Sequence, residues 1–231
     1  MNCGYFSAVY RLDCHLSTAS NHESSTAAKV TCQIMNTKNS PTKDNPSVIL
    51  PPSLEGRFIV LVGLMGAGKT NLGRHIAEST MRPFVDADSE IEKAAGCSVE
   101  EIFERFDEEY FREGERRVIA RILSNEPAVL ATGGGAFMNP KTRKLIGESG
   151  VSVWLRADLD LLVKRTERRD HRPLLKNGNH RNILSKLIDE RYPIYGEADI
   201  IFEVNDEPAP ETAKRLLAVL QNYQVDNESG Q

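Results

Sequence analysis

Short apolar runs alternate with amphipathic stretches through the chain after residue 57. Five runs have the length and composition of buried strands: Phe58–Val62, Pro83–Asp86, Ala128–Thr132, Val151–Leu155 and Asp199–Val204. Apolar residues at helical spacing predict helices near Lys69–Ser79, Asp88–Ala95, Val99–Arg105, Glu108–Ser124, Lys141–Glu148, Leu159–Arg168, Arg181–Arg191 and Glu211–Gln221. Strands separated by helices form a parallel sheet that is covered on both faces. The fold class is therefore α/β, with the ligand site expected at the carboxyl ends of the strands.

The first 55 residues lack this periodicity. They are rich in Ser, Thr and Asn, and a segment that cannot bury an apolar face is expected to stay disordered. The segment has neither the basic flank and long apolar region of a signal peptide nor the arginine content of a transit peptide. Met35 begins a polar stretch typical of a natural N-terminus, so an over-extended start also explains the upstream residues. We predict an N-terminal extension, residues 1–55, and one domain, residues 56–231.

Charge and composition narrow the classes of function. The net charge is −4 and the arginines are interleaved with acidic residues, which argues against a nucleic-acid surface. No apolar run approaches the roughly 18 residues that a membrane span needs. Cys97 is the only cysteine after residue 55, and the chain has no C-x-x-C pair, which disfavours zinc ligation and fits a reducing cytosol. We expect a cytoplasmic protein without nucleic-acid or membrane partners.

A complete phosphate loop, G-x-x-x-x-G-K-[ST], follows the first strand. Residues 63–70 read Gly-Leu-Met-Gly-Ala-Gly-Lys-Thr. Glycines let backbone N–H groups close around a polyphosphate, Lys69 reaches the β- and γ-phosphates, and the Thr70 hydroxyl ligates Mg²⁺. The alternative is a glycine-rich turn before an N-capped helix. The strand before the loop and the helical pattern after it favour nucleotide binding.

Two aspartates follow the second strand. Asp86 and Asp88 lie two residues apart on an extended segment, so both carboxylates face one site, one near Mg²⁺ and one near a substrate hydroxyl. The same spacing fits a solvated turn, and Asp88 also fits the N-cap of the next helix. The place of this pair at a strand end beside a phosphate loop favours the functional interpretation.

Two further patterns supply polar groups near the strand ends. Gly133, Gly134 and Gly135 present backbone N–H groups without side chains, which suits close approach of an anion or a sugar-like ring; a flexible turn is the alternative. Arg112 and Glu115 lie three residues apart on one helix face. There the carboxylate holds the guanidinium in the orientation that a carboxylate-binding arginine needs, although a surface ion pair has the same spacing.

Arginines gather in the C-terminal third of the chain. Residues 165–173 are rich in guanidinium groups and poor in apolar residues, a composition that fits equally a mobile lid over a triphosphate and a solvated loop. Further on, Arg191 stands two residues before Pro193. We expect this proline to end the helix and to aim Arg191 at the site.

Taken together, these stretches resemble the shikimate kinase family over residues 58 to about 205. The shared motifs, in chain order, are the phosphate loop, F-x-D-x-D (Phe84–Asp88), F-R-x-x-E (Phe111–Glu115), the Gly133–Gly135 triplet, R-P-L-L (Arg172–Leu175) and R-x-P-[LI]-Y (Arg191–Tyr195). The resemblance implies a P-loop, nucleoside-monophosphate-kinase-like three-layer fold with a five-stranded parallel sheet in the order 2-3-1-4-5, helices on both faces and a lid. Met65, Asn71 and Ile194 depart from the commoner residues and remove no charge that the mechanism needs.

The resemblance also implies roles for the nucleotide side of the site. The ATP phosphates are bound by Gly66, Ala67, Gly68, Lys69, Thr70 and Asn71. Thr70 holds one Mg²⁺ directly and Asp86 holds it through water. Arg172 is the lid arginine on the phosphates, and Arg165 lies beside adenine.

On the acceptor side, Asp88 holds the hydroxyl that is phosphorylated and accepts its proton. The carboxylate of shikimate is bound by Arg112, Gly134 and Arg191, with Gly133 and Gly135 in the same site. The catalytic set implied in this way is Lys69, Asp88 and Arg172.

The expected activity is ATP-dependent phosphorylation of the 3-hydroxyl of shikimate, for chorismate and aromatic amino-acid synthesis, by a monomer. A gluconate-type small-metabolite kinase on the same fold would share the phosphate loop and the acidic second strand. It would have no reason to keep the arginines and glycine of the carboxylate site. A non-catalytic nucleotide-binding regulatory module is the other alternative. It is disfavoured because every residue of the catalytic set is intact.

Overall fold

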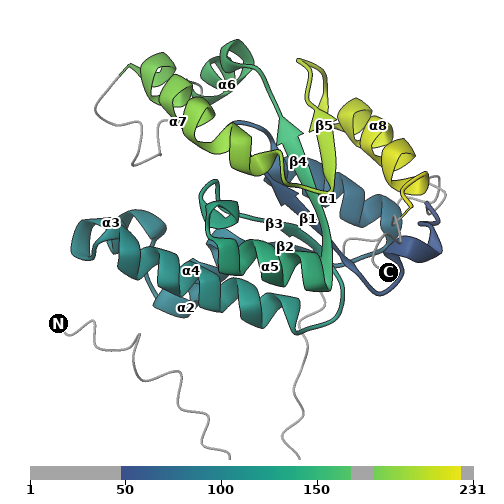
Figure 1. Cartoon of the computed structure of the whole chain (residues 1–231), viewed down its shortest axis with the longest axis horizontal. Helices are drawn as coiled ribbons and strands as arrows, with labels where there is room; N and C mark the ends of the chain where they lie inside the picture. The colour runs from purple at the N-terminus through teal and green to yellow at the C-terminus, as the bar shows by residue number, and fades with distance from the viewer. Residues whose placement is uncertain (1–47, 168–178, 225–231) are drawn as a thin grey trace, which may run out of the picture. The chain divides into compact units, whose positions relative to one another are not determined.

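The computed structural model describes residues 48–167 and 179–224. Its centre is a five-stranded parallel sheet in the order β2-β3-β1-β4-β5, with helices on both faces (Figure 1). The strands are β1 (Phe58–Val62), β2 (Phe84–Asp86), β3 (Val129–Ala131), β4 (Gly150–Arg156) and β5 (Ile200–Glu203). The α/β class and the strand order are both confirmed. The expected lid falls mostly within residues 168–178, outside the described part of the chain.

Every helix expected from the periodicity is present. They are α1 (Lys69–Thr80), α2 (Ala87–Ala95), α3 (Val99–Arg105), α4 (Glu108–Leu123), α5 (Pro140–Ser149), α6 (Leu159–Thr166), α7 (His180–Tyr195) and α8 (Ala209–Gln221). Two short 3-10 helices, η1 (Pro52–Leu54) and η2 (Ala136–Met138), complete the described structure. Polar side chains cap most of these helices and so fix where they begin. The capping residues are Asp86, Ser98, Asp107, Asn139, Asp158 and Asn179.

The core is built around β1, the central strand. It pairs in parallel with β3 on one side and β4 on the other, and all five of its residues are buried. A strand covered on both faces needs apolar side chains at successive positions, which explains the unbroken run Phe-Ile-Val-Leu-Val. Burying each such side chain stabilises the fold by about 1.5–3 kcal/mol. This rigid strand leads directly into the phosphate loop.

The end of α7 differs from the sequence expectation. Pro193 does not end the helix, which continues to Tyr195. A proline in a helix has no N–H to donate to the carbonyl four residues earlier, here that of Asp189. The helix tolerates this missing hydrogen bond because only two helical residues follow Pro193. In addition, the ring of Tyr195 is fully buried against Trp154, with 5.8 Å between the ring centroids.

The described domain begins upstream of residue 55. The backbone N–H of Val48 donates to the carbonyl of Ser79 (2.8 Å), and Leu54 is fully buried. The Ser53 hydroxyl donates to the carbonyl of Tyr223 (2.6 Å), close to the end of the described structure. Residues 48–55 therefore pack on the domain, and residues 1–47 lie outside the described part. Among the described helices, none is both long and apolar enough to cross a membrane.

Candidate active site

A large cavity of about 1250 Å³ lies at the carboxyl ends of the central strands. It brings together residues from distant parts of the sequence: the phosphate loop, the two aspartates at the end of β2, the glycine triplet after β3, three residues of α4 and single residues of α6 and α7. Predicted site residues that line it are Gly66, Ala67, Gly68, Lys69, Thr70, Asn71, Asp86, Asp88, Arg112, Gly133, Gly134, Gly135, Arg165 and Arg191. Arg172 lies outside the described residues.

The phosphate loop adopts a conformation that requires glycine. Gly63 has a φ of 135°, and a side chain there would place its Cβ 2.8 Å from the carbonyl oxygen of Leu155 on β4. Lys69 begins α1, and its ammonium donates to the carbonyls of Gly63 (2.7 Å) and Leu64 (3.0 Å) across the loop. The first N–H groups of α1 and this ammonium give the loop a positive character that suits a polyphosphate.

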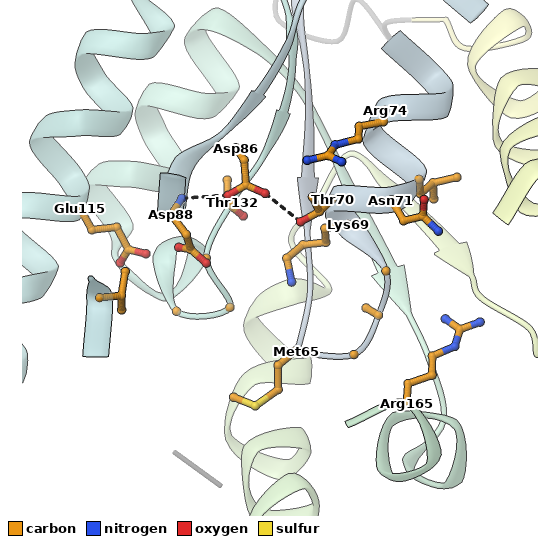
Figure 2. A pocket seen from close by; sticks show the side chains of 18 of the residues that line it. Met65, Lys69, Thr70, Asn71, Arg74, Asp86, Asp88, Glu115, Thr132 and Arg165 are labelled. Atoms are coloured by element: carbon orange, nitrogen blue, oxygen red, sulfur yellow. Dashed lines mark hydrogen bonds between the residues drawn. The ribbon is translucent and has the colours of Figure 1, made fainter. Parts of the chain in front are cut away.

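Asp86 connects the phosphate loop to α2. Its Oδ2 accepts a hydrogen bond from the Thr70 hydroxyl (2.8 Å), and its Oδ1 accepts from the backbone N–H groups of Asp88 (3.1 Å) and Ser89 (3.4 Å) (Figure 2). The N-cap of α2 is therefore Asp86, and the alternative that Asp88 caps this helix is wrong. The Asp88 side chain instead points toward the glycine triplet: a Cβ on Gly133 would lie 2.9 Å from its Oδ1.

The Thr70–Asp86 pair fits a magnesium ion. A hydroxyl and a carboxylate already within hydrogen-bond distance are hard oxygen ligands of the kind that Mg²⁺ prefers. In phosphoryl-transfer sites Mg²⁺ takes one or two protein oxygens and completes its shell with phosphates and water. This agrees with the described residues, which contain no group of three or more His, Cys, Asp or Glu placed to hold a metal by themselves.

On α4, Arg112 and Glu115 form the ion pair that their spacing predicts. Arg112 Nη1 donates to Glu115 Oε2 (2.8 Å), and Arg112 Nη2 donates to Glu108 Oε1 (3.0 Å). Glu115 is only 2% exposed, so the pair lies in the cavity wall rather than on the surface. Burial raises the pKa of the Glu115 carboxyl, and the charge and hydrogen bond of Arg112 oppose this rise. A buried pair of this kind fixes the guanidinium in one orientation.

The glycine triplet makes room for charged side chains, a role that the sequence did not reveal. A Cβ on Gly133 would lie 2.6 Å from Glu115 Oε1, and one on Gly135 would lie 2.4 Å from the guanidinium atoms of Arg112. These distances are far below normal contact, so any larger residue would displace the ion pair. Gly134 and Gly135 do form a turn, as the alternative expected, and Gly133 and Gly135 are packed against specific side chains.

Arg191 reaches the same triplet from α7. Its Nη1 donates to the carbonyl of Gly134 (2.9 Å), and the hydroxyl of Tyr195, one turn later, donates to the same oxygen. Tyr195 is the site neighbour that residue-by-residue reasoning missed. Its spacing of four residues from Arg191 was the available signal, since such residues share a helix face.

Arg165, near the end of α6, lines the cavity on the side of the phosphate loop (Figure 2). Its Nη2 donates to the carbonyl of Asn205 (3.0 Å), and its Nη1 lies 3.7 Å from the position of a Cβ on Gly68. The structure thus places this guanidinium between the phosphate loop and the segment that follows β5.

The family model described as shikimate kinase matches residues 65–221. The chain belongs to the shikimate kinase family. It is 56% identical over 177 residues to the shikimate kinase of Paramagnetospirillum magneticum, which covers 75% of this chain and 91% of that one. It is 49% identical over 167 residues to the shikimate kinase of Brucella canis, and this match covers 72% of this chain and 84% of that one.

Solved structures of the shikimate kinase family agree. A shikimate kinase from Acinetobacter baumannii in complex with shikimate superposes with a TM-score of 0.68 at 40% identity, covering 71% of this chain and 92% of that one. A shikimate kinase from Bacteroides thetaiotaomicron superposes with a TM-score of 0.67 at 30% identity, covering 71% of this chain and 98% of that one. A gluconokinase from Sinorhizobium meliloti gives 0.51 at 21% identity, covering 71% and 91%, and this likeness concerns the fold alone.

Proposed function

We propose that this chain transfers the γ-phosphoryl group of ATP to the 3-hydroxyl of shikimate, giving shikimate 3-phosphate and ADP. One observation carries the proposal: two guanidinium groups from different helices, Arg112 and Arg191, meet at a glycine triplet beside Asp88, in the cavity that holds a complete phosphate loop. A kinase for a neutral acceptor has no use for two converging arginines. A hydroxylated acid needs them to bind its carboxylate.

On the donor side, the phosphates of ATP lie along residues 66–71 and contact the Lys69 ammonium. The two carbonyls that now accept from this ammonium hold it at the loop before phosphate arrives. Thr70 and Asp86 would hold one Mg²⁺, Asp86 through water, and the ion would neutralise phosphate charge when bound. Arg165 lies beside adenine, and Arg172, outside the described residues, acts as the lid arginine on the phosphates.

On the acceptor side, the carboxylate of shikimate lies between Arg112, Arg191 and Gly134, with Gly133 and Gly135 beside it. Asp88 then orients the 3-hydroxyl and accepts its proton as the new bond to phosphorus forms. Because Asp86 is the N-cap of α2, the Asp88 carboxylate does not serve as the helix cap. Phosphoryl transfer asks little covalent chemistry of the protein, so positioning and charge stabilisation supply most of the acceleration.

An ADP-release assay across shikimate, quinate, gluconate and no acceptor tests the proposed activity. We expect turnover with shikimate at least tenfold above that with the other acceptors. Equal rates with and without an acceptor would refute the kinase assignment in favour of an ATPase or a nucleotide-binding switch. A higher rate with gluconate would refute the acceptor assignment alone.

Substitution of Arg191 tests the carboxylate site. Arg191→Ala should raise the KM for shikimate about 10-fold to 100-fold and change the KM for ATP little, because a charge-assisted bond is lost on one ligand only. Arg181→Ala is the matched control, since Arg181 lies on the same helix, is 54% exposed and pairs with Asp160 away from the cavity lining. Equal rises for both substrates in Arg191→Ala would indicate a folding defect.

We further propose that the enzyme works as a monomer in the cytoplasm. One chain supplies the phosphate loop, Asp88 and both arginines to a single cavity, so the proposed reaction calls for no residue from a second subunit. Sedimentation of the purified protein at assay concentration, combined with activity that is proportional to enzyme concentration, tests the monomer. Activity that falls disproportionately on dilution would contradict it.

A further inference from the structure

The Tyr195 hydroxyl makes a contact that the proposed reaction does not yet use. Tyr195 is fully buried at the end of α7, and its hydroxyl donates to the carbonyl oxygen of Gly134. The Arg191 guanidinium donates to the same oxygen at 2.9 Å. A carbonyl oxygen has two lone pairs, so this pair of donors uses its full capacity.

We propose that Tyr195 is a positioning residue for carboxylate binding: its hydroxyl fixes the Gly134 carbonyl against which Arg191 is oriented. The inference rests on the proposed function, because it assigns Arg191 to the acid group of the acceptor. Tyr195 does not line the cavity, so the proposed effect passes through the Gly134 carbonyl.

Fixing this carbonyl has a defined consequence for the backbone. The peptide bond between Gly134 and Gly135 is planar, so holding its C=O also fixes the direction of the Gly135 N–H on the opposite side. Glycine residues have wide conformational freedom, and a run of three needs an external contact to hold one peptide orientation. Tyr195 supplies that contact with a hydroxyl that has little freedom of its own.

The ring of Tyr195 is held by neighbouring aromatic side chains. Its centroid lies 5.8 Å from that of Trp154, 6.3 Å from Tyr192 and 6.4 Å from Phe137. A Cβ on Gly134 would lie 3.6 Å from both the Gly63 oxygen and Arg191 Nη1, so the phosphate loop and the arginine are both neighbours of this residue. The hydroxyl therefore contacts the triplet from a ring whose position is fixed by packing.

Tyr195→Phe tests the proposal, because it removes one oxygen and keeps the ring. We expect the KM for shikimate to rise about fivefold, the scale of one lost hydrogen bond, with kcat and the KM for ATP within twofold of wild type. Tyr192→Phe is the matched control: Tyr192 lies on the same helix, packs edge-on against Trp154 and donates to the Ala157 carbonyl instead. We expect all three kinetic parameters of this control to stay within twofold.

A double-mutant cycle separates positioning from simple stabilisation of the fold. In an Arg191→Ala background, Tyr195→Phe should change the dissociation constant for shikimate less than twofold, because the residue through which the hydroxyl acts is gone. A fivefold loss in both backgrounds would overturn the proposal, as would an unchanged KM in the single variant. Failure of the wild-type enzyme to phosphorylate shikimate would instead overturn the proposed function, so the two failures are distinguishable.

Discussion

Gly135→Ala changes the proposed carboxylate site without removing any charged group. Gly135 has φ −104° and ψ −11°, a conformation open to alanine, so the backbone itself resists the change little. The cost comes from the new methyl group. Its carbon would lie 2.4 Å from Cζ, Nη1 and Nη2 of Arg112, where carbon atoms normally stay about 3.5 Å from their neighbours. The guanidinium must therefore move by roughly 1 Å.

The surroundings of Arg112 set the size of the effect. Its partner Glu115 is 2% exposed and cannot follow the guanidinium, whereas Glu108 is 66% exposed and can. The displaced guanidinium then meets the acceptor carboxylate in the wrong place. Losing one charge-assisted hydrogen bond costs about 1.5–3 kcal/mol, which corresponds to a rise in the KM for shikimate of about 10-fold to 100-fold. Overpacking should also lower the free energy of unfolding by about 1–3 kcal/mol.

The assay is a coupled measurement of ADP release with each substrate varied in turn, combined with urea unfolding. Gly147→Ala is the control, since a Cβ on this α5 residue meets nothing within 4 Å. Its kinetics should match wild type, and its stability should rise by up to about 1 kcal/mol because alanine is the better helix former. A KM for shikimate within twofold of wild type in Gly135→Ala would refute the argument that this guanidinium binds the acid.

Three further predictions follow from other parts of the structure. Asp86→Asn should raise the Mg²⁺ concentration needed for activity, and excess metal should partly rescue it. Asp88→Asn should lower kcat roughly 100-fold or more, and excess metal should not rescue it. The reverse pattern in a Mg²⁺ titration would exchange the two roles. A chain starting at Met35 should keep full kcat/KM and melting temperature. A chain starting at residue 56 lacks the buried Leu54, so its free energy of unfolding should fall by at least about 1.5–3 kcal/mol. A tenfold loss of kcat/KM in the chain that starts at Met35 would show that the upstream segment contributes to activity. Burial raises the pKa of Tyr195 to about 12, while tyrosine in the unfolded chain ionises near pH 10, so wild-type stability should fall by about 2 kcal/mol between pH 10 and 12. Urea unfolding of Tyr195→Phe should lack this loss, and parallel curves for the two proteins would contradict the prediction.

The sequence predicted the sheet and about half of the residues that line the cavity, because these depend on local patterns. The apolar run of β1 and the phosphate loop after it are contiguous, and a rigid strand ending in glycines leaves few alternatives. The N-cap of α2 was harder to assign, because Asp86 and Asp88 are both residue types that cap helices well. Only the backbone conformation at the start of the helix decides between them. The continuation of α7 past Pro193 depends on the burial of Tyr195, which is a tertiary effect.

The packing of the glycine triplet was not predictable from local pattern. Gly135 is crowded by Arg112, and Gly133 by Glu115, from a helix that precedes them by about twenty residues in the chain. Spacing alone shows that glycine allows close approach, but it does not say whether a ligand or a side chain approaches. The same limit applies to Tyr195, whose partner Gly134 lies on a different element.

The hydrogen bond from Ser53 to the Tyr223 carbonyl joins the two ends of the described domain. It lies beside the start of β1, at the amino edge of the sheet, whereas the cavity opens at the carboxyl edge. The described domain is thus nearly closed into a ring on the side away from the cavity. Because residues 53 and 223 lie within hydrogen-bond distance, a short peptide that joins the chain beside them would complete that ring at little entropic cost, and the chain could then be opened at a surface loop to give a circularly permuted enzyme.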